Sequence, residues 1–326
     1  MRRPSPRALL LGAAVVGVVG AAVVDSVRHG SSRTRPTQSV PARTAAPVGG
    51  LLVPQRQQLV GRLRRAGLQG VLYFVDQRCE LEAVRLPSLA AAPAPRGGGC
   101  RAVVSPASAP PGWSLWPRDT PLAASCDGTR VVVTASAGPA LPMIGGCAPA
   151  WRSDGSMTYV RRGAIVQFPR TGRAQVLRPR AQLAGMLARA TGVPHSKPFR
   201  VRTIAWLGPT RCAVVAIAGS RTALAVLAGR QVAALRLDVP RAAREVRASP
   251  RGTFLVMRTK AGVVVYDARR PTLPQAQRLR GDAVTWSPDE RWLATARNGA
   301  IVLTRRRTRI ILPIAARDLA WTRALG

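Results

Sequence analysis

Residues 282–296, DAVTWSPDERWLATA, decide the fold that this sequence encodes. An alternating apolar run leads to Trp286, a Ser-Pro-Asp turn follows, and a second alternating run begins at Trp292. Alternation with a period of two predicts β-strands, and Ser-Pro-Asp between two such runs predicts a tight turn. A second copy, APAWRSDGSMTYV, stands at residues 148–160, so the strand–turn–strand unit is repeated.

The same texture extends over residues 70–326, which we predict to form one domain. Short runs rich in Val, Ile, Leu and Ala are separated by Gly, Pro, Asp and Arg. These runs are 71–76, 81–86, 129–135, 157–160, 212–218, 222–228, 253–257, 262–268 and 300–304. Many short strands with turn signals between them indicate an all-β sandwich, barrel or propeller.

The internal period selects the propeller. The residues that align immediately before each turn are Trp116, Trp151, Trp206, Ala248, Trp286 and Trp321. Their successive steps are 35, 55, 42, 38 and 35 residues, and a four-stranded propeller blade has a repeat of about 40 to 50 residues. A helical insertion at residues 180–198 explains the longest step, because Leu183, Met186 and Leu187 have helical spacing.

The two ends of the domain predict how the ring closes. The chain ends just after Trp321, with no room for the other strands of that unit. The first unit, which begins at Val71, lacks a first strand of its own. We therefore expect the two ends to complete one blade, which removes the open sheet edges of a linear array.

At these residues the chain resembles the WD-repeat-like propellers, and most closely the TolB-like six-bladed type. Blades of that type carry a Trp-Ser-Pro-Asp-Gly-like turn between their first and second strands. The resemblance covers residues 71–321 and is most specific at 286–289 and 151–155; the sequence departs from the pattern at Glu290, where Gly is usual. The resemblance implies an all-β, six-bladed β-propeller. A second turn-like SPAS within residues 100–116 leaves a seventh, abbreviated blade as the alternative.

The repeated residues are expected to have structural roles. The large aromatic faces suited to packing one blade on the next belong to Trp151, Trp206, Trp286 and Trp321. Pro288 fixes a turn dihedral, and Asp154 and Asp289 can accept hydrogen bonds from the backbone of their own turns. We favour this interpretation over a catalytic one for the two aspartates.

The segment before the domain has the features of an export signal. Residues 1–7 contain three arginines, and residues 8–24 contain neither a charge nor a polar side chain. We predict a single-pass transmembrane signal anchor, with a cleaved signal peptide and secretion as the alternative. Residues 25–50 are predicted to be a disordered linker, and residues 51–69 a short amphipathic helix that packs on the domain. Contact of its arginines with lipid headgroups is the alternative.

Four of the five cysteines fall into two similar pairs. Cys79 and Cys100 are 21 residues apart, as are Cys126 and Cys147, whereas Cys212 stands alone in an apolar run. Equivalent places in successive units favour one within-blade disulfide used twice, Cys79–Cys100 and Cys126–Cys147. Disulfides agree with export to an oxidising compartment. The absence of a close Cys-x-x-Cys pair argues against zinc, and Cys212 is expected to be a buried thiol.

Groups for enzyme chemistry are scarce in the sequence. It contains no Gly-x-Ser-x-Gly nucleophile turn, no phosphate-binding loop and no dinucleotide fingerprint. The two histidines are His29, in the linker, and His195, in the insertion, so His195 is the weak candidate for a general base. We expect no cofactor and no bound metal.

The formal net charge of +36 comes almost entirely from arginine, with lysine only at Lys197 and Lys260. The arginines are dispersed, which argues against a nucleic-acid partner, and heavy use of Arg and Ala also fits a G+C-rich coding bias. We favour a monomeric, membrane-tethered, non-enzymatic binding or scaffold module for a protein, peptide or cell-envelope polymer. One alternative is a hydrolase or lyase of anionic polymers, and another is an arginine-based binder of anionic lipids or wall polymers.

Overall fold

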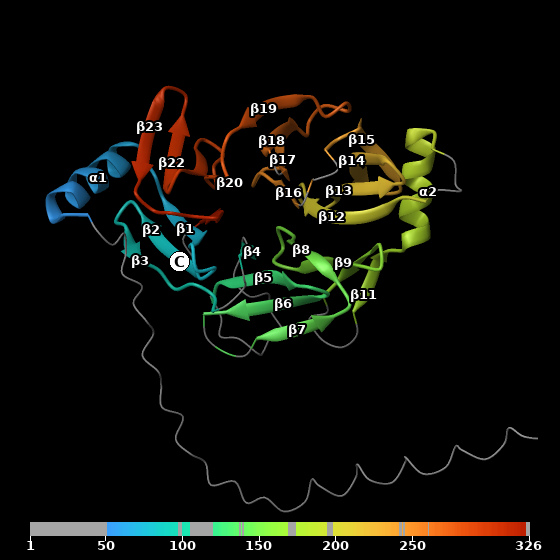
Figure 1. The fold of residues 1–326 in the computed structure, drawn as a ribbon, viewed down its shortest axis with the longest axis horizontal. Helices are drawn as coiled ribbons and strands as arrows, with labels where there is room; N and C mark the ends of the chain where they lie inside the picture. The colour runs from blue at the N-terminus through green and yellow to red at the C-terminus, as the bar shows by residue number, and fades with distance from the viewer. Residues whose placement is uncertain are drawn as a thin grey trace, which may run out of the picture. The chain divides into compact units, whose positions relative to one another are not determined.

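The computed structural model describes residues 51–96, 100–104, 120–136, 138, 140–168, 174–193, 198–240, 243, 245–259 and 261–323. These residues form six four-stranded antiparallel sheets and two helices (Figure 1). The predicted anchor at 8–24 and the predicted linker at 25–50 lie outside this range. Within it, neither helix has the length and apolar character that crossing a membrane requires.

We number the sheets 1 to 6 in chain order, and each runs outward from its first strand. Sheet 1 contains β24 (Asp318–Thr322), β1 (Gly70–Val75), β2 (Leu81–Leu86) and β3 (Ala90–Ala91). Sheet 2 contains β4 (Ala102–Val104), β5 (Leu122–Asp127), β6 (Arg130–Ala135) and β7 (Leu141–Ile144). Sheet 3 contains β8 (Cys147–Trp151), β9 (Met157–Arg161), β10 (Ala164–Gln167) and β11 (Gln175–Arg178).

The second half of the domain repeats this order. Sheet 4 contains β12 (Arg200–Trp206), β13 (Arg211–Ala218), β14 (Arg221–Ala228) and β15 (Gln231–Leu237). Sheet 5 contains β16 (Glu245–Ala248), β17 (Phe254–Thr259), β18 (Gly262–Asp267) and β19 (Gln275–Leu279). Sheet 6 contains β20 (Ala283–Trp286), β21 (Leu293–Arg297), β22 (Ala300–Arg305) and β23 (Thr308–Leu312).

The first strands of the sheets pack on one another around a common centre. Strand β12 contacts β8 on one side and β16 on the other, and β24 contacts β20 and β4. The four strands of each sheet then follow outward, as Figure 1 shows. This arrangement is a β-propeller, so the predicted all-β propeller class is confirmed.

Sheet 1 is shared between the two ends of the domain, as predicted. Strand β24 pairs antiparallel with β1, and Leu72 lies opposite Trp321 in the register. Gly70 at the start of β1 has φ +108°, and a Cβ there would lie 2.3 Å from the carbonyl oxygen of Thr322. Glycine is therefore required where the N-terminal strand meets the C-terminal one.

Apolar clusters between neighbouring sheets form the core, because each strand alternates its side chains between two faces that are both covered. Both helices extend these clusters at the outer side. Helix α1 (Val53–Arg65) lies within the segment 51–69 and buries Leu59 and Leu63 against sheets 6 and 1. Helix α2 (Arg180–Thr191) packs on sheets 3 and 4 and ends at Gly192 with φ 65°, inside the predicted insertion.

The second predicted repeat lies partly outside the described residues. Residues 105–119, which include Trp116, lie outside the described residues. The first strand of sheet 2 is β4, which ends at Val104 and directly precedes the SPAS segment. The SPAS segment itself also lies outside the described residues, and the described part of the chain contains six sheets and no seventh.

Candidate functional site

The first strands enclose a cavity of about 960 Å³ at the centre of the ring. Every sheet contributes to its wall. The contributing residues include Val104 of β4, Ala150 of β8, Thr203 of β12, Val246 of β16, Thr285 of β20 and Ala320 of β24. We call this space the central cavity, and it is the candidate functional site because all six sheets converge on it.

The repeated turns after the first strands surround one mouth of the central cavity. Ser153, Gly208, Pro250 and Pro288, which all belong to these turns, line it. Antiparallel strands joined by a short turn place that turn at one end of the sheet. The Trp-Ser-Pro-Asp repeats therefore form the rim of the cavity.

Hydrogen bonds within each turn fix the shape of this rim. The N–H of Gly252 donates to the Ser249 carbonyl at 2.8 Å, and the N–H of Glu290 donates to the Ser287 carbonyl at 2.8 Å. Asp289 Oδ1 accepts from the hydroxyl of Ser287 at 2.5 Å and from the backbone N–H of Arg291, in the same turn, at 3.1 Å. The carboxylates of the turns thus hold the backbone.

Asp154 has the same role in sheet 3. Its Oδ1 accepts from the backbone N–H of Ser156 at 2.9 Å and from the hydroxyl of Ser156 at 2.6 Å. These contacts account for the position of the carboxylate at the turn. They agree with the expected structural role of both aspartates.

The repeat tryptophans lie between sheets. Trp206 Nε1 donates to Thr158 Oγ1 of sheet 3 at 2.7 Å, and the Arg152 guanidinium lies 4.8 Å from the Trp206 ring. Trp286 stacks on Phe254 of sheet 5 with ring centroids 5.9 Å apart. These contacts join Trp206 and Trp286 to the preceding sheet, as expected for residues that pack one blade on the next.

Arginine dominates the charge of the central cavity. Its lining arginines are Arg101, Arg202, Arg247, Arg251 and Arg323. Among the lining residues the one carboxylate is Glu245, and it already forms an ion pair with Arg247. The cavity therefore presents uncompensated positive charge, which favours anionic ligands.

Arg247 links sheets 5 and 1 at the wall of this cavity. Its Nη2 donates to Asp318 Oδ2 at 2.6 Å, its Nη1 donates to the Leu319 carbonyl at 2.7 Å, and its Nε donates to Glu245. Burial lowers the pKa of Arg247, but the two carboxylates outweigh burial and raise that pKa above its usual value. Burial also raises the pKa of Asp318, and the charge of Arg247 opposes that rise. We call this group the Arg247 link.

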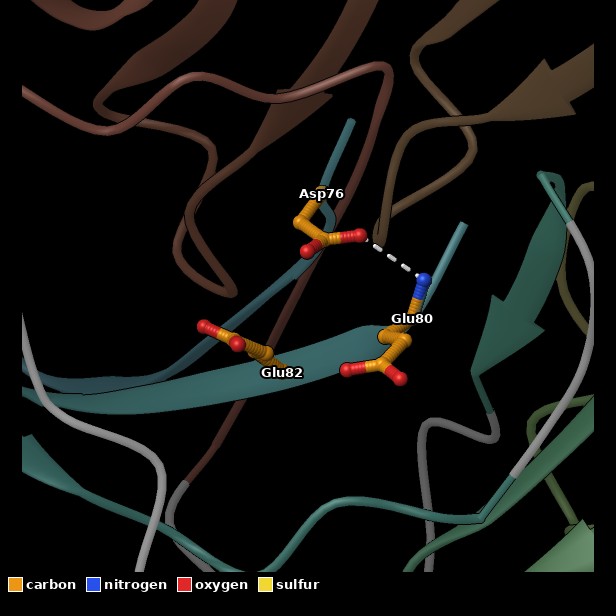
Figure 2. Close-up of side chains that lie close together, drawn as sticks. All are labelled: Asp76, Glu80 and Glu82. Atoms are coloured by element: carbon orange, nitrogen blue, oxygen red, sulfur yellow. Dashed lines mark hydrogen bonds between the residues drawn. The ribbon is translucent and has the colours of Figure 1, made fainter. Parts of the chain in front are cut away.

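A group of three carboxylates lies elsewhere, on the hairpin between β1 and β2 (Figure 2). Oxygen atoms of Asp76, Glu80 and Glu82 all lie within 4.8 Å of one another. Asp76 Oδ1 accepts from the backbone N–H groups of Arg78 and Glu80, each at 2.8 Å. Burial, followed by the charges of Asp76 and Glu80, raises the pKa of Glu82. Because the turn explains the position of Asp76, we assign no metal to this cluster.

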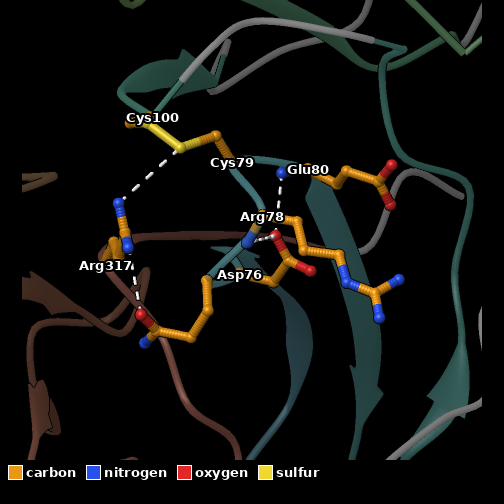
Figure 3. Close-up of a disulfide and its surroundings, with 7 residues drawn as sticks. Asp76, Arg78, Cys79, Glu80, Cys100 and Arg317 are labelled. Carbon is orange, nitrogen blue, oxygen red and sulfur yellow. Dashed lines mark hydrogen bonds between the residues drawn. A yellow bond between two sulfur atoms is a disulfide. The ribbon is translucent and has the colours of Figure 1, made fainter.

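This turn also presents a disulfide (Figure 3). Cys79 is bonded to Cys100 with a Cα separation of 4.3 Å, and Cys126 is bonded to Cys147 with a Cα separation of 5.3 Å. Arg317 donates to Cys79 Sγ at 3.9 Å. Both predicted pairs are confirmed.

The predicted placement of these bridges within single blades is wrong. Cys79 lies between β1 and β2 of sheet 1, whereas Cys100 precedes β4 of sheet 2. Cys126 belongs to β5 of sheet 2, whereas Cys147 begins β8 of sheet 3. After its fourth strand the chain returns to the centre, so a cysteine at that point belongs to the next sheet. Each disulfide therefore fastens two neighbouring sheets.

The remaining candidates are placed as follows. His195, the weak candidate base, and His29 lie outside the described residues. Cys212 is buried in β13 with a free thiol, and burial raises its pKa to about 12. A thiol with that pKa is an inert part of the core.

Comparisons with known proteins report on the fold. No protein-family model matches the chain, and no curated protein matches it. The β-propeller domain of Cps50 (Swd1) from Myceliophteria thermophila is similar with a TM-score of 0.44 and 13% identity, over 74% of this chain and 84% of that domain. Apo AztD from Citrobacter koseri is similar with a TM-score of 0.36 and 10% identity, over 62% of this chain and 59% of AztD. Similarity at this level carries no functional argument.

Proposed function

We propose that this protein is a non-enzymatic binding module of the cell envelope whose ligand enters the central cavity. The observation that carries this proposal is the cavity itself: about 960 Å³, walled by all six sheets and lined by five arginines. A volume of this size lies at the upper end of the range for small-ligand pockets. It admits a peptide segment or a few units of a polymer.

The charge of the lining residues indicates the ligand's chemistry. Glu245 is paired with Arg247, whereas Arg202, Arg251 and Arg323 are exposed and form no ion pair within the described part of the chain. An arginine guanidinium binds carboxylates and phosphates through two parallel hydrogen bonds. The ligand is accordingly an acidic segment of a protein or peptide, or an anionic envelope polymer.

A binding role fits the lining better than an enzymatic one. Among the described residues that line the central cavity, Glu245 is in an ion pair, and Cys126 and Cys147 are bonded to each other in a disulfide. Arginine stays protonated in proteins and does not act as a proton-accepting base at neutral pH. An envelope hydrolase or lyase that uses His195 is the alternative function.

The proposed location rests on separate features. The apolar segment at 8–24 and the linker at 25–50 provide a membrane anchor and a tether, and the two disulfides fit an oxidising compartment outside the cytoplasm. We further infer that the six sheets act as the six blades of one ring. The shared sheet 1 supports that inference, because it joins the first and last strands of the domain.

The test compares two triple variants by calorimetric titration with poly-L-glutamate and with alginate. The first carries Arg202→Glu, Arg251→Glu and Arg323→Glu, which reverse the exposed charges of the central cavity. The control carries the same change at three exposed arginines of outer hairpins, Arg221, Arg230 and Arg305. We expect the cavity variant to lose at least tenfold in affinity for the bound probe and the control to stay within about twofold.

Two results would overturn the proposal. Equal losses in both variants would show that only the overall charge matters. Turnover of either probe, abolished by His195→Ala, would establish the enzyme instead.

A further inference from the structure

A second cavity, of about 590 Å³, lies at the other end of the first strands. It is formed where β17 ends, where β20 begins and where β21 ends, which is the end of sheets 5 and 6 opposite to the repeated turns. Its charged lining residues are Arg101, Arg258, Arg280, Arg297 and Asp282. We call this space the lower cavity, and it is separate from the central cavity, although Arg101 lines both.

We propose that the lower cavity is a binding site for phosphate groups. Four arginines and one aspartate line it, and none of the four arginines forms an ion pair within the described part of the chain. Four like charges around one hollow repel one another, and a bound anion removes that repulsion. Without a bound anion, the site therefore has an excess of positive charge.

Arg258 provides a second, independent indication. Its Nη1 is buried and has no hydrogen-bond partner. A buried donor without an acceptor is costly, and native structures pair nearly all such groups. Arg258 lies opposite Glu245 in the register and influences the pKa of Asp318, and both of these carboxylates are already bonded to Arg247. The guanidinium of Arg258 thus retains unused donor capacity at the wall of the lower cavity.

The geometry favours a phosphate over a lone small anion. A phosphate offers several oxygens to several guanidinium forks at once, and arginine suits that bidentate arrangement better than lysine. About 590 Å³ holds more than one phosphate group, so a chain of linked phosphates or a phosphorylated headgroup fits. Arg280 and Arg297 are exposed at the opening, and Asn298 next to Arg297 adds an amide donor.

The experiment titrates the purified full chain with tripolyphosphate in a calorimeter. The site variant is Arg280→Gln with Arg297→Gln, two exposed residues whose change leaves the core intact. The matched control is Arg221→Gln with Arg230→Gln, an equal loss of charge on outer hairpins of sheet 4. Circular dichroism and thermal unfolding verify that both variants are folded.

We expect the site variant to lose at least tenfold in affinity and the control to lose less than twofold. Binding by the unchanged protein should also weaken steadily as NaCl rises from 50 to 500 mM, because the attraction is electrostatic. A second arm uses monomeric dihexanoyl-phosphatidylglycerol. Binding of both probes with mutual displacement identifies a lipid headgroup as an accepted source, and binding of tripolyphosphate alone identifies a soluble phosphate chain.

Failure of both probes to bind, or equal losses in the site and control variants, would overturn the proposal. These outcomes are independent of the central cavity. The arginines that are changed here do not line it, so poly-L-glutamate or alginate binding there is expected to persist in the Arg280 and Arg297 variant.

Discussion

The Arg247 link makes the sharpest prediction about stability. Arg247→Met keeps an apolar stem of similar length but removes the guanidinium that bonds Glu245, Asp318 and the Leu319 carbonyl. The side chains of the two acids are 15% and 2% exposed, so both carboxylates would be left buried without their main partner. Removing one partner of a buried ion pair costs about 3–5 kcal/mol. Because Arg258 still acts on Asp318, we expect a loss of about 3 kcal/mol in the free energy of unfolding.

The pH dependence separates this cause from a packing defect. Without the guanidinium, burial raises the pKa of Asp318 further above its value in the unfolded chain. An acid whose folded-state pKa is raised binds more protons in the folded state than in the unfolded state. Stability therefore falls as pH rises from the unfolded-state pKa to the folded-state pKa. The deficit of Arg247→Met relative to the unchanged protein should therefore be largest at pH 7 and above, and it should shrink as pH falls towards 5.

Urea unfolding followed by tryptophan fluorescence measures both quantities. The matched control is Arg211→Met, because Arg211 is also partly buried and donates to a backbone carbonyl, that of Ala268, at 2.7 Å. No carboxylate is orphaned there, so a loss of about 1 kcal/mol that does not change with pH is expected. A loss below 1 kcal/mol for Arg247→Met, or a deficit that is equal at pH 5 and pH 8, would refute the reasoning.

Three further predictions concern the ring and its outer edges. Reduction of both disulfides should lower the free energy of unfolding by about 3 kcal/mol for each bridge, since each closes a loop of 21 residues. Urea titrations with and without a phosphine reductant measure this difference. A hydrogen bond from Arg269 is the main reason why the pKa of Asp267 is lowered to about 2. The stability that this carboxylate adds to the fold is therefore present above pH 4 and is lost as pH falls through about 2. In Asp267→Asn the free energy of unfolding should therefore fall less between pH 4 and pH 2 than in the unchanged protein. The difference should be less than about 1 kcal/mol, because Arg269 is exposed. Gly70→Ala should destabilise the ring by several kcal/mol in urea titrations because its Cβ would collide with the Thr322 carbonyl, whereas Gly299→Ala, with φ +72° and open space, should cost only about 1 kcal/mol.

The fold was predictable because its signals are local. Alternation and a Ser-Pro-Asp turn identify a strand pair around Trp286 without knowledge of any distant contact. The shared sheet was also predictable, because the unit at Val71 lacks a first strand and the one around Trp321 has the pattern of a first strand. The disulfide pairs followed from equal spacing, but spacing does not show where a chain leaves one sheet and enters the next.

The candidate sites were hidden because their residues come together only in the closed ring. Arg101, Arg258, Arg280 and Arg297 are far apart in the sequence, and in a chain so rich in arginine no pattern distinguishes them. Glu290 is different, because its departure from the repeat was visible. It has φ 57° where glycine is usual, and its carboxylate accepts from the backbone N–H of Arg251 in the turn of the neighbouring sheet at 2.6 Å.

The distribution of acids leads to a last prediction. The chain has 14 acids against 50 basic residues, and several of these acids are engaged in turns or in the Arg247 link. Both cavities are therefore left with an excess of guanidinium charge, and that self-repulsion opposes the folded state. A ligand that binds only the folded protein stabilises it by about 2.7 kcal/mol at 100 times its dissociation constant. Tripolyphosphate should consequently raise the melting temperature more than NaCl at equal ionic strength, and the excess should vanish in the variant with Arg280→Gln and Arg297→Gln. An equal rise with both salts would mean that the cavities are screened by any counterion, and that their arginines do not form a site.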